Sequence, residues 1–235
     1  MNTARAQLEI NPRQNRLLRA FPAQVQERLF PALQLQYFSA GTVLYEPGQS
    51  ISDVWFPIDS VVALLCSMDD GCSTQVDVVG NEGLLGISAI MSGASVNIHG
   101  LVCVAGHAYV LPAQRLRREF DESAEVRTVL LRYAQSVITA VAQTAFCNRH
   151  HSVEQQVSRW LLRLLDRVPE NNLQMTQELI ARVLGVRAAS VSEVASRIKN
   201  LGVIDYQRGN IVVLNRPRLE QLTCGCYRAF GGGGN

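Results

Sequence analysis

The sequence has no apolar run approaching the about 20 residues that a membrane-spanning helix needs. Its opening stretch, MNTARAQLEI, lacks the apolar core of a secretory signal peptide. The sequence also shows no clustered His/Glu ligand set, no nucleophile beside a base and no phosphate-binding loop. These absences argue against a membrane protein, a secreted protein and an enzyme. They favour a cytoplasmic protein without a cofactor.

Cysteines are present but scattered, and none form a Cys-x-x-Cys pair. The six are Cys66, Cys72, Cys103, Cys147, Cys224 and Cys226. In a cytoplasmic protein they are expected to be free thiols, mostly buried. Only Cys224 and Cys226 are close in sequence, and two ligands without others nearby make a poor chelate. The histidines, His99, His107, His150 and His151, form no recognisable metal set. We therefore predict no metal site, with a redox or metal role of the C-terminal pair as the minor alternative.

The net charge of +2 is unevenly distributed along the chain. Residues 1–149 hold 11 basic and 13 acidic side chains, whereas residues 150–235 hold 11 basic and 7 acidic ones. Proteins that bind DNA neutralise its phosphates with arginine and lysine. The C-terminal excess of positive charge is modest, and it favours nucleic-acid binding in that part of the chain.

Residues 175–214 have the pattern of a winged helix-turn-helix, a module that places one helix in the major groove of DNA. Thr176 is a suitable N-cap for the first helix. Ala181 is small enough for a second helix to approach, and Gly185 tolerates the left-handed conformation of a tight turn. A helix-hairpin unit that only packs within the protein is the alternative interpretation.

The second helix, predicted over residues 187–199, is the expected recognition helix. Val191, Val194 and Ile198 face inward at helical spacing. Residues 203–204 and 211–213 flank a glycine-containing turn and form the predicted wing. The residues expected to contact DNA are Thr176, Gln177, Arg187, Ala188, Ala189, Ser190, Ser192, Glu193, Arg197 and Arg208.

The N-terminal half has short β-rich runs separated by turn residues, which is typical of an antiparallel roll or jelly roll. Strands are predicted at residues 34–38, 42–45, 53–57, 61–68, 74–79, 96–104 and 108–111. Asp69, Asp70 and Gly71 form a predicted hairpin turn. A short helix from Pro22 precedes the strands, and another, at residues 113–120, follows them.

A long helix is predicted from residue 121 to about residue 148 because apolar residues recur at steps of three and four. We expect this face to form a dimer interface, as in a coiled coil. Its members are Val126, Leu130, Tyr133, Val137, Ala140, Val141 and Thr144. Packing of the helix only within its own subunit is the alternative. Ser152 and Gln155 form a capping box for the next helix, which makes residues 148–151 a predicted hinge.

This order of elements resembles the superfamily of bacterial transcription factors that contains the cyclic-AMP receptor protein and the fumarate–nitrate regulator, the Crp/Fnr superfamily. The matching residues are Phe38, Gly41, Leu44, Tyr45 and Gly48, the segment 148–162 and the segment 175–214. The resemblance covers about residues 17–222. It implies an α+β chain with three parts: a cyclic-nucleotide-binding-like β-roll at 17–120, a dimerisation helix at 121–148 and a winged helix-turn-helix at 149–235. The implied function is a homodimer that binds a palindromic promoter site and contacts RNA polymerase.

The sensor part departs from the family pattern. Relatives that bind cyclic nucleotides have a Gly-Glu pair and then an arginine for the phosphate. Here Ile87 replaces the glutamate after Gly86, and Asn97 stands where the arginine belongs. A buried phosphate without a cationic partner is costly, so the sequence argues against the usual cyclic AMP site. The effector is left open, with Gly86, Ile87, Asn97 and Ile98 as the residues nearest to the expected pocket.

Other sensor types of the family are also weakly supported. The fumarate–nitrate branch carries an N-terminal cysteine cluster for an iron–sulfur centre. Here no cysteine precedes Cys66, which argues against that cluster. Haem bound through a histidine is left open.

The recognition helix departs from the pattern as well. The family commonly shows Arg-Glu-x-x-x-Arg, but the matching positions hold Ala188, Ala189 and Glu193. Alanine methyl groups suit thymine methyls, and glutamate accepts a hydrogen bond from the cytosine amine. The DNA target is therefore expected to differ from the familiar ones. The alternatives to a DNA-binding regulator are a small-molecule signalling module whose helix-turn-helix docks protein and an enzyme with a cupin-like metal barrel.

Overall fold

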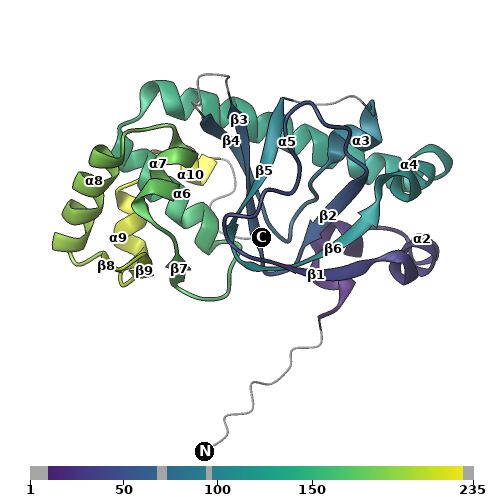
Figure 1. The fold of residues 1–235 in the computed structure, drawn as a ribbon, viewed down its shortest axis with the longest axis horizontal. Coiled ribbons are helices and arrows are strands. Elements are labelled where there is room, and N and C mark those ends of the chain that lie inside the picture. The colour runs from purple at the N-terminus through teal and green to yellow at the C-terminus, as the bar shows by residue number, and fades with distance from the viewer. Residues whose placement is uncertain (1–9, 68–72, 94–96, 230–235) are drawn as a thin grey trace, which may run out of the picture.

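The structure is a computed structural model that describes residues 10–67, 73–93 and 97–229 (Figure 1). The predicted hairpin turn at Asp69, Asp70 and Gly71 lies outside these residues, as does Cys72. Within them, the chain folds into a β-roll, a long helix and a C-terminal helical domain with a small sheet. No helix of the described residues is long and apolar enough to cross a bilayer.

The β-roll contains two antiparallel sheets of three strands, ordered β1-β6-β2 and β4-β3-β5. Its strands are β1 (Gln34–Phe38), β2 (Asp53–Pro57), β3 (Val61–Ser67), β4 (Ser73–Val79), β5 (Ile98–Val104) and β6 (Gly106–Pro112). Its helices are η1 (Pro12–Gln14), α1 (Arg16–Arg19), α2 (Ala23–Leu29), η2 (Phe30–Ala32), α3 (Ile87–Met91) and α4 (Ala113–Glu122). The predicted antiparallel roll is confirmed.

The structure differs from the sequence predictions at two places in the roll. Residues 42–45 form no strand and make only an isolated bridge, from Val43 to Leu101. Gly41 and Gly48 have left-handed backbones on either side, and left-handed residues interrupt an extended strand. The helix α3 was not predicted; it begins after Gly86, whose φ of 88° turns the chain out of its extended course.

The long helix α5 (Ala124–His150) begins at its N-cap Ser123 and lies along the roll (Figure 1). The face predicted to meet a second subunit is turned inward instead. Val126 and Leu130 are fully buried in the core of the roll, and Thr144 is buried as well. The Tyr133 hydroxyl donates a hydrogen bond to the Leu84 carbonyl at 2.7 Å. The remaining predicted members, Val137, Ala140 and Val141, are half-buried.

The reason for this difference is that helical periodicity marks a buried face without saying what buries it. The roll of the same subunit supplies the partner for the apolar residues of that face. Large apolar side chains remain exposed on another face of α5: Leu131 is 45% exposed, Ile138 60% and Phe146 52%.

The C-terminal domain begins with α6 (Val153–Leu165), whose capping box of Ser152 and Gln155 is present as predicted. It continues with β7 (Asn172–Gln174), α7 (Gln177–Leu184), α8 (Ala188–Asn200), β8 (Ile204–Gln207), β9 (Asn210–Val213), α9 (Arg216–Gln221) and α10 (Cys226–Ala229). The sheet order is β7-β9-β8. Strand β7 was not predicted, because three residues are too few for an alternating pattern to show.

The roll and the C-terminal domain share one hydrophobic core. Apolar residues of β3, β4 and β5 belong to the same buried cluster as those of α6, α7 and α8. Two ion pairs cross the same junction: Arg163 with Asp77 at 2.6 Å and Arg167 with Glu82 at 2.6 Å. The orientation of the C-terminal domain is thus determined by packing as well as by the connecting chain.

Candidate DNA-binding interface

The turn between α7 and α8 has the geometry that the sequence predicts. Thr176 caps α7, its side chain accepting a hydrogen bond from the Leu179 amide at 3.2 Å. Gly185 ends the helix with a φ of 66°, and the Val186 amide donates to the Ala181 carbonyl at 3.1 Å. These bonds use the otherwise unpaired backbone groups of the helix ends, and they make the turn tight.

Helix α8 presents one apolar and one open face. Val191, Val194 and Ile198 are buried, as predicted. The predicted DNA contacts on the helix are all exposed or half-buried: Arg187, Ala188, Ala189, Ser190, Ser192, Glu193 and Arg197. In Figure 1 the helix lies at the outer edge of the molecule, away from the roll. No side chain of the described residues caps its N-terminus, which leaves its first amides available to an acceptor at the positive end of the helix dipole.

The wing is the hairpin of β8 and β9. Arg208 and Gly209 form its tip with φ values of 48° and 78°, and the Arg208 side chain is exposed. A groove of about 460 Å³ runs between the start of α7, helix α8 and the wing. Thr176, Gln177 and Arg208 line this groove, so the structure brings these three predicted residues together.

The same groove contains Ser196 and Lys199, which the sequence analysis missed as candidate contacts. Lys199 pairs with Asp205 at 2.9 Å and donates to the Tyr206 carbonyl at 3.2 Å. Its hydrogen bond lowers the pKa of the Asp205 carboxyl. The basic residues in the last turn of α8 are the sequence feature that could have identified Lys199 as a candidate contact.

Arg197 has a structural partner that the sequence did not reveal. Its guanidinium pairs with Glu154 in the first turn of α6, while 60% of the side chain is exposed. Contact of Arg197 with DNA would compete with this ion pair.

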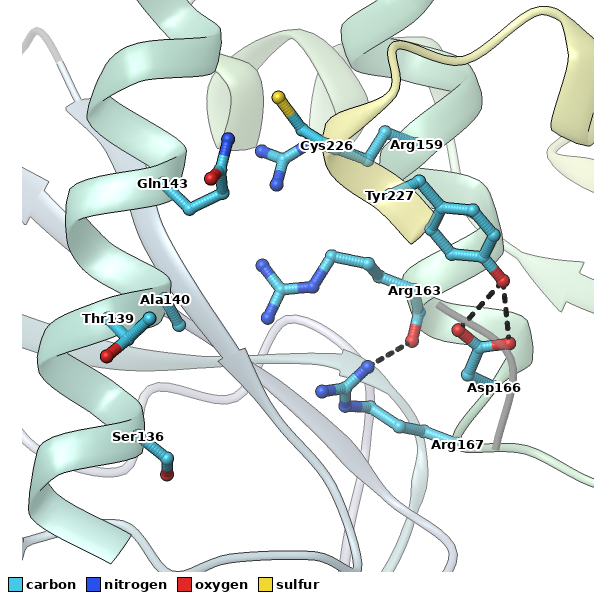
Figure 2. Close-up of a pocket in the computed structure, with 10 residues that line it drawn as sticks. All are labelled: Ser136, Thr139, Ala140, Gln143, Arg159, Arg163, Asp166, Arg167, Cys226 and Tyr227. Atoms are coloured by element: carbon cyan, nitrogen blue, oxygen red, sulfur yellow. Dashed lines mark hydrogen bonds between the residues drawn. The ribbon is translucent and has the colours of Figure 1, made fainter. Parts of the chain in front are cut away.

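A cavity of about 390 Å³ lies outside the helix-turn-helix, between α5, α6 and α10 (Figure 2). Arg159 and Arg163 of α6 and Arg167, just after this helix, follow one another at steps of four and extend toward α5. Arg163 and Arg167 are paired with carboxylates of the roll, and burial lowers the pKa of Arg163. Arg159 is only 7% exposed, and its Nε has no hydrogen-bond partner among the described residues. A buried guanidinium of this kind suits an anionic ligand.

Residues 155–222, which include both helices and the wing, match the family model of the Crp-like helix-turn-helix domain. The chain carries a Crp-like helix-turn-helix domain. No curated protein matches the chain by sequence.

Several solved structures share the fold of the chain. A Crp/Fnr-family transcriptional regulator from Eubacterium rectale ATCC 33656 is 18% identical, with a TM-score of 0.70, and the match covers 89% of this chain and 98% of that one. FixK2 from Bradyrhizobium japonicum is 16% identical, with a TM-score of 0.70 and coverage of 82% and 98%. The global regulator CLP from Xanthomonas campestris is 14% identical, with a TM-score of 0.65 and coverage of 82% and 99%.

The family model shows a Crp-like helix-turn-helix domain at residues 155–222, and the solved structures show that the chain shares the fold of these regulators.

The four residues expected near the effector pocket lie around the beginnings of α3 and β5. Gly86 is the left-handed N-cap of α3, and a Cβ there would lie 3.1 Å from the Asp53 carbonyl. Ile87 begins α3, Ile98 begins β5, and Asn97 is exposed. None of the four lines the cavity of Figure 2, which we call the arginine cavity after Arg159, Arg163 and Arg167.

Proposed function

We propose that this protein is a transcription regulator of the Crp/Fnr type, a cytoplasmic homodimer that binds a palindromic promoter site through α8 of each subunit. The functional parts would be a sensor at 17–120, a dimerisation helix at 121–148 and a DNA-binding domain at 149–235, with RNA polymerase as a further partner. The observation that carries this proposal is the open face of α8, which the fold leaves outward beside the wing. Two such helices one helical turn of DNA apart would contact the two half-sites of a palindrome.

The predicted DNA contacts fall into two groups. Arg208 on the wing and Thr176 at the start of α7 border the groove and suit phosphate oxygens. Ala188, Ala189 and Glu193 are exposed on α8 and suit base edges, with thymine methyls and cytosine amines as partners. Arg187, Ser190 and Ser192 complete this surface, and Gln177 lies at its border.

Selection of bound duplexes from a random pool tests this proposal directly. We expect an inverted repeat with half-sites about one helical turn apart. Loss of both Arg187 and Arg208 to alanine should weaken binding at least about tenfold, since each arginine contact contributes about 1–3 kcal/mol. The matched control is the double variant Arg115→Ala and Arg118→Ala, which removes two exposed arginines of the roll. A purified protein without preference over random duplex at physiological salt would refute the proposal.

A second candidate function, docking of protein through the helix-turn-helix, makes the opposite prediction. The Arg187 and Arg208 variants would then leave DNA affinity unchanged. The match of residues 155–222 to a DNA-binding domain family favours the first proposal.

We propose further that the regulating signal is an anion bound in the arginine cavity, at the junction of the roll, α5 and the DNA-binding domain. Arg159 supplies a buried guanidinium, and a cavity of about 390 Å³ suits a small organic ligand. The similar regulator CLP is described as responsive to c-di-GMP, which makes phosphate-bearing nucleotides the first ligands to try.

Thermal unfolding in the presence of nucleotides tests the cavity. A cyclic mono- or dinucleotide should raise the Tm of the wild-type protein, while the corresponding uncharged nucleoside should not. The variant Arg159→Gln should lose the shift, whereas Arg228→Gln, which changes an exposed arginine, should keep it. An equal shift in the Arg159 variant would place the ligand elsewhere.

A further inference from the structure

Four metal-ligating side chains converge where the long helix ends. They are Cys147, His151, Cys224 and Cys226, and their ligand atoms all lie within 4.8 Å of one another. Cys147 and His151 are one helical turn apart at the end of α5, where His151 is the C-cap. Cys224 and Cys226 flank Gly225 where α10 begins. The fold thus adds two ligands to the C-terminal pair, which the sequence alone made a poor chelate.

The spacing of the sulfur atoms suits a metal ion better than a disulfide. The Sγ atoms of Cys147 and Cys224 are 4.0 Å apart. A disulfide requires a bond of about 2.05 Å. Two thiolates bound to zinc at about 2.3 Å with tetrahedral angles are about 3.8 Å apart. The observed separation is therefore close to one edge of a tetrahedral zinc site.

The surroundings of the cluster also favour the binding of a metal ion. Cys147 and Cys224 are buried, and Nδ1 of His151 is buried without a hydrogen-bond partner among the described residues. An unpaired buried nitrogen is costly, and coordination of a metal would satisfy it. Nε2 of Gln143 donates to the Cys147 sulfur at 3.3 Å, the kind of outer hydrogen bond that supports a metal-bound thiolate.

We propose that Cys147, His151, Cys224 and Cys226 together bind one zinc ion. Three sulfurs and one imidazole nitrogen form the Cys₃His set that closed, structural zinc sites use. Soft thiolate ligands select zinc over the magnesium and calcium ions that prefer oxygen. Coordination replaces the three thiol protons, which leave to solvent, and no oxidation or reduction takes place.

The ion would join segments that are distant in the sequence. It would tie the end of α5 to the C-terminal segment, where Tyr227 is buried in the domain core and forms hydrogen bonds with Asp166 at 3.0 Å and with Arg216 at 3.0 Å. A metal that binds only the folded arrangement stabilises it. Zinc would therefore hold the DNA-binding domain to the long helix.

Metal analysis of the purified full-length protein tests the proposal. We expect about one zinc per chain in the wild type and less than about one fifth of that in Cys226→Ser or His151→Gln, since each removes one of the four ligands. The matched controls are Cys66→Ser and His150→Gln, which change a half-buried cysteine of β3 and the exposed histidine next to the site. Both should keep their zinc. Equal zinc in all variants would mean adventitious binding and would overturn the proposal.

A second measurement needs no variant. The wild-type protein, stripped of metal with a chelator under reducing conditions, is titrated with Co²⁺. A tetrahedral site with three thiolates gives intense visible bands and a thiolate-to-cobalt charge-transfer band, which one equivalent of Zn²⁺ then abolishes. Zinc should also raise the Tm of the stripped protein. Weak bands of octahedral cobalt, or a Cys147–Cys224 disulfide in the protein isolated without reductant, would refute the site whether or not the protein binds DNA.

Discussion

Gly185 has two roles: it forms the turn between α7 and α8, and it packs closely against the roll. Its left-handed backbone ends α7, and a Cβ on it would lie 3.0 Å from the Ser73 carbonyl of β4. The sequence showed the first requirement, because a helix-turn-helix needs glycine in its turn. Only the structure shows the second, the contact with the roll.

The variant Gly185→Ala should therefore lower the free energy of unfolding by more than the cost of a left-handed alanine alone. Gly202→Ala is the matched control, since Gly202 has a φ of 68° and nothing within 4 Å of an added Cβ. Left-handed alanine costs about 1–2 kcal/mol at either site. Crowding against backbone should add about 1 kcal/mol or more at Gly185. Urea unfolding measures both, and equal losses would show that the turn does not press on the roll in solution.

Glu119 is a second residue with a measurable role, because it links α4 to α2. Its carboxylate accepts hydrogen bonds from Nε and an Nη of Arg28 at 2.8 and 2.7 Å. This pairing holds the pKa of Glu119 below its usual value. A carboxyl with a lowered folded-state pKa contributes stability above its unfolded pKa of about 4.3, and that contribution is lost as the pH falls through the folded pKa.

The expected result is a pH-dependent difference between wild type and Glu119→Gln. The difference in free energy of unfolding should be constant near neutral pH and should shrink in acid, below the unfolded pKa of about 4.3. Unfolding by urea across this pH range measures it. The control is Glu122→Gln, which removes the same charge from an exposed neighbour outside the hydrogen-bonded pair; an equal pH dependence in both variants would contradict the role of the pair.

At the scale of the element, the long helix α5 is present as predicted, but the face predicted to form the dimer interface is buried against the roll. The apolar residues at steps of three and four predicted the helix itself, and the structure confirms it. The residues predicted for the dimer, such as Val126 and Leu130, pack on the roll. Leu131 and Ile138, seven residues apart, lie on the exposed face and provide the spacing of a coiled coil.

A charge on this exposed face should therefore prevent dimerisation. Leu131→Glu combined with Ile138→Glu should shift the protein toward monomer by at least about tenfold in the dissociation constant, since burying unpaired carboxylates in an interface is costly. Analytical ultracentrifugation measures this. The control is Leu214→Glu, which changes an apolar residue that is 61% exposed beyond the wing. If the double variant dimerises as the wild type does, another surface forms the dimer.

At the scale of the whole molecule, the junction between the roll and the DNA-binding domain is a continuous core with ion pairs across it. Asp77 is only 4% exposed and pairs with Arg163 of α6. Removing one partner of such a pair leaves the other charge buried and unpaired. The junction thus fixes how α7 and α8 are placed relative to the roll.

The variant Asp77→Asn should destabilise the protein by roughly 2–4 kcal/mol, close to the value for breaking a buried ion pair. Asp121→Asn is the control, because Asp121 pairs with Arg117 on the exposed surface, and such pairs contribute at most about 1 kcal/mol. Chemical unfolding gives both values. A loss of under about 1 kcal/mol for Asp77→Asn would mean that the pair is hydrated and does not hold the junction.

The sequence by itself determined most of the local elements: most strands of the roll, the long helix, the two helices around Gly185 and the wing. These follow from periodicity, capping residues and turn residues, which act over a few neighbouring positions. Tertiary structure alone decided which face of α5 is buried and that Arg197 pairs with Glu154. It also brought Cys147 and His151 to Cys224 and Cys226. The physical reason is that each of these contacts joins residues far apart in the chain, so that no local pattern can encode it.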